Sequence, residues 1–219
     1  DERKKAEERE NFLHSLLTHD IKNKTQVLKG YLELLEETDL TERQKKMVSK
    51  ANSALMKGVT LVKKVDTLMK ISEMEKEKVR LSPIIDTVVS EFEPEAEKED
   101  IEIEFDLDDF YVIGDGLMDD LFSNIIMNSI KHSKGSKIRI RTEDIDDHVR
   151  VIIEDDGIGI SDDLKETIFE KNSKKGKYAG SGLGMYIAKK IVGGLEGDIE
   201  VKDSDMGGAR FDVILKKEK

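Results

Sequence analysis

An imidazole, a carboxylate and an amide fall within about one helical turn of the segment LLTHDIKNK, residues 16–24. With helical spacing, Asn23 lies on the same face as His19, and Asp20 is directly adjacent. An imidazole with its ordinary pKa of about 6.5 is mostly neutral, and therefore nucleophilic, at neutral pH. The carboxylate can bind the other ring nitrogen, fix the tautomer and accept a departing proton. The trio could therefore accept a transferred group, although a lone histidine on an exposed helix is usually only solvated.

A second candidate is the turn DDGIGI, residues 155–160, in which an acid ends an apolar strand. Asp155 is followed by Gly157 and Gly159, and these small residues let the backbone approach a ligand closely. The carboxylate of Asp155 can accept a proton from the amino group of a bound base. The turn is therefore a candidate for recognising the base of a nucleotide.

A third candidate is GSGLGM, residues 180–185, which leads directly into a predicted helix. Gly180, Gly182 and Gly184 leave free N–H groups at the helix N-terminus, and the helix dipole favours an anion such as phosphate there. The stretch matches neither the Walker A pattern nor the G-x-G-x-x-G of dinucleotide sites. A single glycine-rich turn is more often only a turn, so this signal needs support from elsewhere.

That support comes from the segment DDLFSNIIMNSIKHS, residues 119–133, on which Asn124, Asn128 and Lys131 share one helical face. An amide oxygen suits Mg²⁺, which keeps several waters and is usually completed by substrate phosphates. Taken alone, two such amides more often only face solvent or cap a neighbouring loop. Together with the acid and the glycine-flanked helix terminus, they provide the separate parts of a Mg-nucleotide site.

The composition limits the other partners. The chain has 219 residues, 37% of them apolar, which suits one or two domains. Its formal charge of −11 disfavours nucleic acid and anionic lipid, and the absence of cysteine excludes disulfides and thiolate metal sites. No apolar run reaches about 18 residues, so we expect no membrane contact within this sequence. A start at Asp1 suggests a fragment of a longer, perhaps membrane-anchored protein, and a cytoplasmic location fits.

Two amphipathic helices must position His19. One runs from about residue 10 to 37, and the second begins at Thr41, which forms a capping box with Gln44. The short link predicts antiparallel neighbours. Their apolar seams have alternating spacings of four and three and are too wide for two helices alone, so we expect a homodimer with a four-helix bundle. The seam positions are Leu17, Ile21, Lys24, Leu28, Tyr31, Leu35, Val48, Ala51, Leu55, Gly58, Val62, Val65 and Met69.

The pattern changes after the polar run EKEKV, and we place a domain boundary between residues 78 and 79. Ser82 and Pro83 have the types expected at the N-cap and first position of a new helix. Strands are predicted at 101–107, 111–113, 137–145, 148–155, 197–203 and 207–216, and further helices at 116–132, 161–169 and 183–192. The second half is therefore expected to be a mixed α/β domain.

The ordered motifs resemble the N, G1, F and G2 boxes of two-component sensor histidine kinases. The matching residues are Asn128 to Lys131, Asp155-x-Gly157-x-Gly159, Ile168-Phe169-Glu170 and Gly180-Ser181-Gly182-Leu183-Gly184. The resemblance covers essentially the whole chain. The nucleotide-binding half is also similar to DNA gyrase and the large heat-shock chaperones, whereas the histidine-bearing hairpin is similar only to the kinases.

The resemblance implies an α+β multidomain protein. Residues 1–78 would form a dimerisation and histidine phosphotransfer hairpin, and residues 79–219 a catalytic ATP-binding domain with the α/β sandwich fold of the GHKL (Bergerat) type. His19 would be phosphorylated from Mg-ATP and would pass the phosphoryl group to an aspartate on a response-regulator receiver domain. An upstream sensor domain would precede the segment in the full protein.

The resemblance also implies roles for individual residues. Asn128 would bind Mg²⁺, Asn124 and Lys131 would lie near the phosphates, and Asp155 would bind the adenine amino group. Asn23 would position the water that hydrolyses the phospho-aspartate of the regulator, which implies phosphatase activity. The segment 161–180 would form a lid, for which Gly176 and Gly180 supply hinges. His14, His132 and His148 are given no role.

Two positions depart from the family pattern. Lys24 replaces a proline that bends the helix in many members, so this helix is expected to be straighter. The F box has no second aromatic residue soon after Phe169, and the lysines of NSKKGK, residues 172–177, either clamp phosphates or only solubilise a loop. Two alternatives stay open at this point: a catalytically silent nucleotide-binding dimer scaffold, and an ATPase clamp of the gyrase type.

Overall fold

The computed structural model describes the backbone of residues 2–171 and 182–218, and the side chains of residues 19–171 and 182–218. The chain forms two compact units, Asp1–Met69 and Lys70–Lys219.

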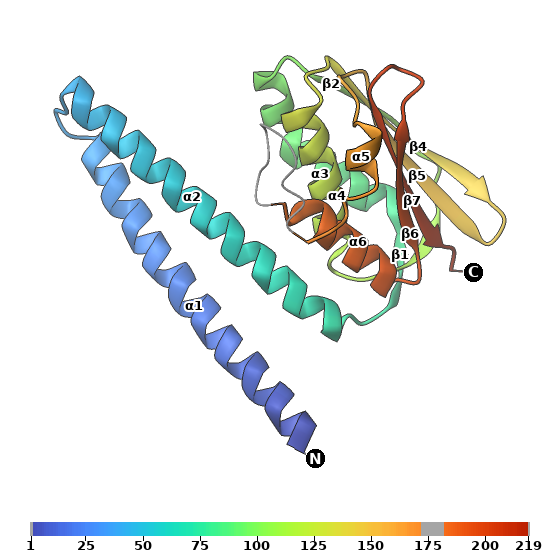
Figure 1. Cartoon of the computed structure of the whole chain (residues 1–219), viewed down its shortest axis with the longest axis horizontal. Helices are drawn as coiled ribbons and strands as arrows, with labels where there is room; N and C mark the ends of the chain where they lie inside the picture. Colours follow the sequence, from blue (N-terminus) through green and yellow to red (C-terminus); the bar gives the residue numbers. More distant parts are fainter. Residues whose placement is uncertain (1, 172–181, 219) are drawn as a thin grey trace. The chain divides into compact units, whose positions relative to one another are not determined.

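The first unit is a helical hairpin of α1 (Glu2–Glu36) and α2 (Glu42–Lys70), the two long helices of Figure 1. The predicted capping box is present, because the Thr41 N–H donates to Gln44 Oε1 at 2.9 Å and the Gln44 N–H donates to Thr41 Oγ1 at 3.4 Å. Thr41 is thus the N-cap, and α2 begins one residue later. The α1 helix begins at Glu2, earlier than the sequence pattern predicted.

The predicted α1 seam is exposed in a single hairpin. Ile21 is 41% exposed, Leu28 53%, Tyr31 64% and Leu35 46%. Apolar side chains at this spacing form a continuous stripe along one helix face, and a stripe of this kind favours burial against another helical surface.

The division between the units lies between Met69 and Lys70, earlier than the predicted boundary at 78 and 79. A short 3-10 helix, Ile71–Glu73, leads to strand β1 (Glu77–Arg80), which the polar sequence did not reveal. β1 pairs antiparallel with β3 (Tyr111–Gly114), with Val79 opposite Val112. The two-stranded ribbon therefore makes residues 77 and 78 part of the second unit.

The main sheet of the second unit has the strand order β2-β4-β5-β7-β6. Its strands are β2 (Glu102–Asp106), β4 (Lys137–Ile145), β5 (His148–Asp155), β6 (Asp198–Asp203) and β7 (Ala209–Lys216). β2 pairs parallel with β4, and the other pairs are antiparallel. The alternation of β5 turns Val149, Val151 and Ile153 to one face, where all three are fully buried.

Three helices cover that apolar face: α3 (Leu81–Lys98), α4 (Met118–His132) and α6 (Gly184–Gly194), which lie on one side of the sheet in Figure 1. They bury Ile85, Leu121, Phe122 and Ile191 completely. The predicted α/β sandwich is therefore confirmed, with its core between one helical layer and one face of the sheet.

Two local predictions were wrong. Ser82 does not cap α3, which begins at Leu81 with Arg80 as N-cap; the Ser82 hydroxyl instead donates to Asp109 Oδ1 at 3.0 Å. Strand β1 runs directly into this helix, and the first free N–H, that of Leu81, donates to the Phe110 carbonyl at 3.0 Å. The helix predicted over 161–169 is limited to α5 (Asp162–Lys165), and turns follow it.

Candidate functional site

Asp155 ends strand β5 on the face that the helices cover, and only 2% of its surface is exposed. Its Oδ1 atom accepts hydrogen bonds from the N–H groups of Gly157 and Ala209, each at 3.1 Å. Burial raises the pKa of this carboxyl, and the two N–H donors offset part of that effect. Asp155 is therefore a buried acceptor, and the donors that hold it among the described residues are neutral.

The next residue has a different task. Asp156 Oδ1 accepts the N–H groups of Ser136 and Lys137 at 2.8 and 2.9 Å, and Oδ2 accepts the Ser136 hydroxyl at 2.8 Å. Burial opposes ionisation of Asp156, but these hydrogen bonds outweigh it and lower its pKa. Asp156 therefore fixes the loop before β4, and Asp155 alone of the pair faces the candidate site.

Glycines make room around Asp155. A Cβ atom on Gly157 would lie 2.1 Å from the Ser133 carbonyl oxygen, and Gly159 has a φ of +69°, which favours glycine. Both glycines were predicted from the sequence as residues of this site. Gly208 was not predicted: its N–H donates to the Asp155 carbonyl at 3.1 Å, and a Cβ atom on it would lie 2.1 Å from Asp155 Oδ1. The adjacent glycines in MGGARF, residues 206–211, were the available signal.

Helix α4 carries the predicted polar face. Asn124 Nδ2 donates to the Asp120 carbonyl at 2.7 Å, which leaves its amide oxygen as an acceptor. Asn128 is half-buried and Lys131 is exposed. Burial, followed by the nearby charge of Lys131, lowers the pKa of His132, so this ring adds little positive charge near neutral pH. Asn128 and Lys131 thus have the accessibility that a phosphate and metal site requires.

The chemistry of these donors decides which metal could bind. The described residues contain no group of three or more histidine, cysteine, aspartate or glutamate side chains that could hold a metal ion. An Asn128 oxygen alone fits Mg²⁺ that arrives with phosphates, because Mg²⁺ keeps several waters and needs few protein ligands. The site does not fit a zinc or calcium centre built by the protein alone.

The predicted phosphate-binding turn is described in part. Gly182 has a φ of +64°, and α6 begins at Gly184 with its first turn available to an anion. Gly180, the proposed hinge at Gly176, and the lysines of residues 172–177 lie outside the described residues. The segment before them is anchored: Lys165 Nζ binds Asp203 Oδ1 at 2.7 Å, and Lys189 Nζ lies 5.5 Å from the centroid of the Phe169 ring.

The acceptor trio lies on α1 in the first unit. His19, Asp20 and Asn23 are all exposed. Asn23 Nδ2 lies 3.4 Å from His19 Nδ1, a contact at the long end of hydrogen-bond distances. Because an asparagine amide can donate through nitrogen or accept through oxygen, Asn23 can stabilise either neutral tautomer of the ring. The ring-nitrogen contact that the structure shows is therefore with Asn23 rather than with Asp20.

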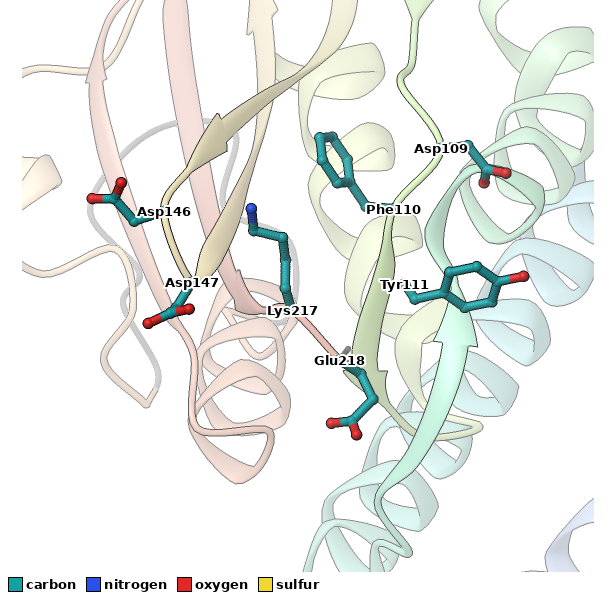
Figure 2. Close-up of a pocket in the computed structure, with 7 residues that line it drawn as sticks. All are labelled: Asp109, Phe110, Tyr111, Asp146, Asp147, Lys217 and Glu218. Atoms are coloured by element: carbon teal, nitrogen blue, oxygen red, sulfur yellow. The ribbon is translucent and has the colours of Figure 1, made fainter.

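A cavity of about 270 Å³ lies elsewhere in the second unit, and Figure 2 shows the residues that line it. They are Asp109, Phe110, Tyr111, Asp146, Asp147, Lys217 and Glu218. Several of its polar groups bind within the protein: Asp109 Oδ2 accepts Arg80 at 2.6 Å, and Lys217 Nζ binds Asp144 at 2.6 Å. The cavity contains none of the predicted site residues, and we assign it no part in the chemistry.

Comparison with known proteins identifies the second unit. Residues 115–219 match the family described as histidine kinase-, DNA gyrase B-, and HSP90-like ATPase. The catalytic domain of the histidine kinase ThkA is 30% identical, with a TM-score of 0.60, and the match covers 66% of this chain and 97% of that one. The structure of ShkA in complex with AMPPNP has a TM-score of 0.76 over 94% of this chain and 46% of its own; at 22% identity this likeness supports the fold alone.

Curated relatives extend the match over both units. The sensor histidine kinase AruS of Pseudomonas aeruginosa is 24% identical over 96% of this chain, and the signal transduction histidine-protein kinase BaeS of Escherichia coli is 28% identical over 99%. The chain spans 23% of the length of AruS and 48% of that of BaeS. No helix among the described residues has the length and apolar content needed to cross a bilayer. Fold, motifs and relatives agree, and the chain belongs to the sensor histidine kinases of two-component systems.

Proposed function

We propose that this chain transfers the γ-phosphoryl group of ATP to His19 and then to an aspartate on a response-regulator receiver domain. One observation carries the proposal: an exposed histidine with an amide at its ring nitrogen occurs in the same chain as a buried carboxylate that, among the described residues, has no ion pair and lies on a nucleotide-binding fold. An exposed imidazole can be reached by two different partners, the ATP and the receiver, which a two-step relay requires.

Each site residue has a task in binding. Asp155 accepts a hydrogen bond from the adenine amino group, and the first turn of α6 binds phosphate together with Lys131. Asn128 would hold Mg²⁺ through its amide oxygen, and the ion would neutralise charge on the phosphates. Asn124 lies one turn earlier on the same helix and completes the polar face.

The transfer forms a bond between a ring nitrogen of His19 and the γ-phosphorus and breaks the bond from that phosphorus to the bridging oxygen, so that ADP leaves. The attacking nitrogen must carry a lone pair, and the proton on the other ring nitrogen is lost after attack. Asp20 is the nearest carboxylate in sequence and would take up that proton. Asn23 would orient the ring during the attack and, in a separate phosphatase reaction, would position the water that hydrolyses the phospho-aspartate of the regulator.

The exposed α1 seam supports a homodimer in which two hairpins form a four-helix bundle, since each copy would cover the stripe of the other. The relatives are sensor kinases of greater length, and we place this segment in the cytoplasm, downstream of a sensor domain that is not part of the sequence.

Incubation with ATP labelled at the γ-position tests the proposal. The wild-type chain should gain label that acid removes and base does not, and His19→Ala should reduce that label to background while ATP affinity stays unchanged. His14→Ala, a histidine substitution in the same helix, is the matched control and should keep the label. Acid-labile label on His19→Ala would refute the acceptor assignment.

The silent scaffold and the ATPase clamp predict different results in the same assay. A scaffold would bind ATP and give no label on either variant. A clamp would release inorganic phosphate at a rate that His19→Ala leaves unchanged. Neither alternative gives a task to the contact between Asn23 and His19, and this contact favours the kinase.

A further inference from the structure

A buried hydroxyl without a partner lies beside the candidate base site. Ser129 is 1% exposed, and within the described part of the chain its Oγ atom has no hydrogen-bond partner of ordinary geometry. Buried polar atoms in native proteins are usually satisfied, and an unmade hydrogen bond in a buried place destabilises the fold. A buried polar atom that lacks a normal hydrogen bond beside a ligand site therefore indicates that the bound ligand supplies its hydrogen-bond partner.

The last turn of α4 places this hydroxyl at the site. The Ser133 N–H donates to the Ser129 carbonyl at 3.0 Å, and the Ser133 carbonyl accepts the Ile158 N–H at 2.8 Å. The same turn of helix therefore packs on the D-x-G-x-G segment that begins at Asp155. The hydroxyl faces the Asp155 carboxylate, and a loose hydrogen bond from it lowers the pKa of that carboxyl, against the larger effect of burial.

The chemistry of adenine suggests what the hydroxyl binds. The edge of the base that carries the amino group presents that donor next to an acceptor, the ring nitrogen N1. A carboxylate can only accept, so Asp155 can satisfy the amino group but not N1. The N1 acceptor requires a hydrogen-bond donor, and a serine hydroxyl can donate.

We propose that the Ser129 hydroxyl donates a hydrogen bond to N1 of the bound adenine, beside the Asp155 carboxylate that accepts from the amino group. Ser129 is thereby a specificity-determining residue of the base site. The inference rests on the proposed ATP binding and adds to it the group that reads the ring nitrogen. Guanine would place a carbonyl oxygen against the Asp155 carboxylate, so the hydrogen bond from the amino group would be lost and two acceptors would face each other.

Two nucleotides test the inference, ATP and 1-deaza-ATP, in which a C–H replaces N1. Titration calorimetry with Mg²⁺ should show that the wild-type chain binds 1-deaza-ATP about tenfold more weakly than ATP, the value of one hydrogen bond. Ser129→Ala should bind ATP about tenfold more weakly and should no longer distinguish the two nucleotides. Ser123→Ala, the same change on the same helix, should keep the wild-type preference.

Thermal unfolding without nucleotide gives a second readout. Because Ala removes a buried hydroxyl without a partner and favours helix, Ser129→Ala should unfold at the wild-type temperature or above. A hydroxyl with a purely structural role would give a lower temperature. The inference is overturned if Ser129→Ala still prefers ATP over 1-deaza-ATP, or if it unfolds at a lower temperature than wild type. If the wild-type chain binds neither nucleotide, the proposed function fails first and this inference with it.

Discussion

Two adjacent residues of β5, Glu154 and Asp155, are both buried and yet differ in their ionisation. Glu154 is 0% exposed and Asp155 is 2% exposed. Because successive side chains of a strand point to opposite faces, Glu154 lies on the outer face of the sheet and Asp155 on the face that the helices cover. Burial opposes ionisation of both, but the pKa of Glu154 is lowered while that of Asp155 is raised.

The difference follows from their partners. Glu154 Oε1 accepts Arg139 at 2.8 Å and Arg141 at 3.3 Å, and Oε2 accepts the Ser204 hydroxyl at 3.1 Å. On the same outer face, Asp212 is also fully buried and binds Arg210 at 2.6 Å and Lys202 at 2.9 Å. Asp155 has backbone N–H donors and no ion pair among the described residues.

The comparison of Glu154 with Asp155 distinguishes acids that stabilise the fold from acids that are available to a ligand. A carboxylate surrounded by arginines is satisfied within the protein and has nothing to offer a ligand. A buried carboxylate held only by neutral donors is destabilising until another donor arrives, and perturbed acids of this kind cluster at functional sites. The outer face therefore stabilises the fold, and on the inner face Asp155 is the acid available to the nucleotide that we propose binds here.

The largest effect is expected for Asp155→Asn. ATP affinity should fall by about a hundredfold, since the amino group of adenine loses a charged acceptor. Nucleotide-free stability should stay equal or rise, because the buried charge is removed. Calorimetric titration and urea unfolding measure the two quantities. Wild-type affinity in Asp155→Asn would remove Asp155 from the base site.

Gly208→Ala tests whether the backbone holds Asp155 in place. The new Cβ would lie 2.1 Å from Asp155 Oδ1 and 2.4 Å from its carbonyl oxygen, so the turn must shift. We expect a loss of about 3 kcal/mol in the free energy of unfolding, together with weaker ATP binding. Gly193→Ala is the matched control: nothing lies within 4 Å of its Cβ, and it should stabilise α6 by about 0.5–1 kcal/mol. Equal effects of the two substitutions would contradict this account.

Glu154→Gln should show the opposite pattern to Asp155→Asn. It removes a buried charge that arginines satisfy, and the free energy of unfolding should fall by about 2 kcal/mol. The loss stays moderate because the side chains of Arg139 and Arg141 are 40% and 34% exposed and can be rehydrated. ATP affinity should stay within about twofold of wild type, because Glu154 lies on the opposite face of β5 from Asp155 and is joined to the Gly208 turn indirectly, through Ser204. A large loss of affinity without unfolding would show that the two faces are coupled.

The two acids should change the free energy of unfolding in opposite directions as the pH is raised. The lowered pKa values of Glu154 and Asp212 contribute stability that is present above their unfolded values near 4 and lost as pH falls through the folded values. For Asp155 the folded pKa is raised, so its contribution is favourable at low pH and is lost as pH rises from the unfolded value through the folded one. Urea unfolding across a pH series, wild type against Glu154→Gln and Asp155→Asn, should give difference curves of opposite slope.

The sequence predicted the parts of this site that have their own local signal. Alternation gave β4 and β5 with their observed bounds, and the D-x-G-x-G turn pointed to Asp155. It did not reveal Gly208 or Ser129, because their importance comes from contacts with Asp155 across the fold. Ser82 was misassigned for a similar reason: a local capping pattern was overridden by Asp109, which is distant in sequence. The strand β1 has no local signal, since its polar residues pair only because β3 lies beside them.

The smallest effect concerns the anchor of the predicted lid. Lys165 Nζ binds Asp203, and Asp203 lies opposite Ala209, whose N–H donates to Asp155. The pair therefore connects α5, at the start of the predicted lid, to the strand pair that holds Asp155. Because Asp203 is 77% exposed, solvent weakens the interaction, and Lys165→Gln should raise the KM for ATP only a few-fold. As a control away from the lid, Lys45→Gln breaks an exposed pair with Glu42 in the hairpin and should leave KM unchanged. If Lys165 acts on the lid through its pair with Asp203, then Asp203→Asn should raise the KM for ATP by the same factor as Lys165→Gln. The double variant should then raise KM no further than either single variant. Additive effects would show that each residue acts alone.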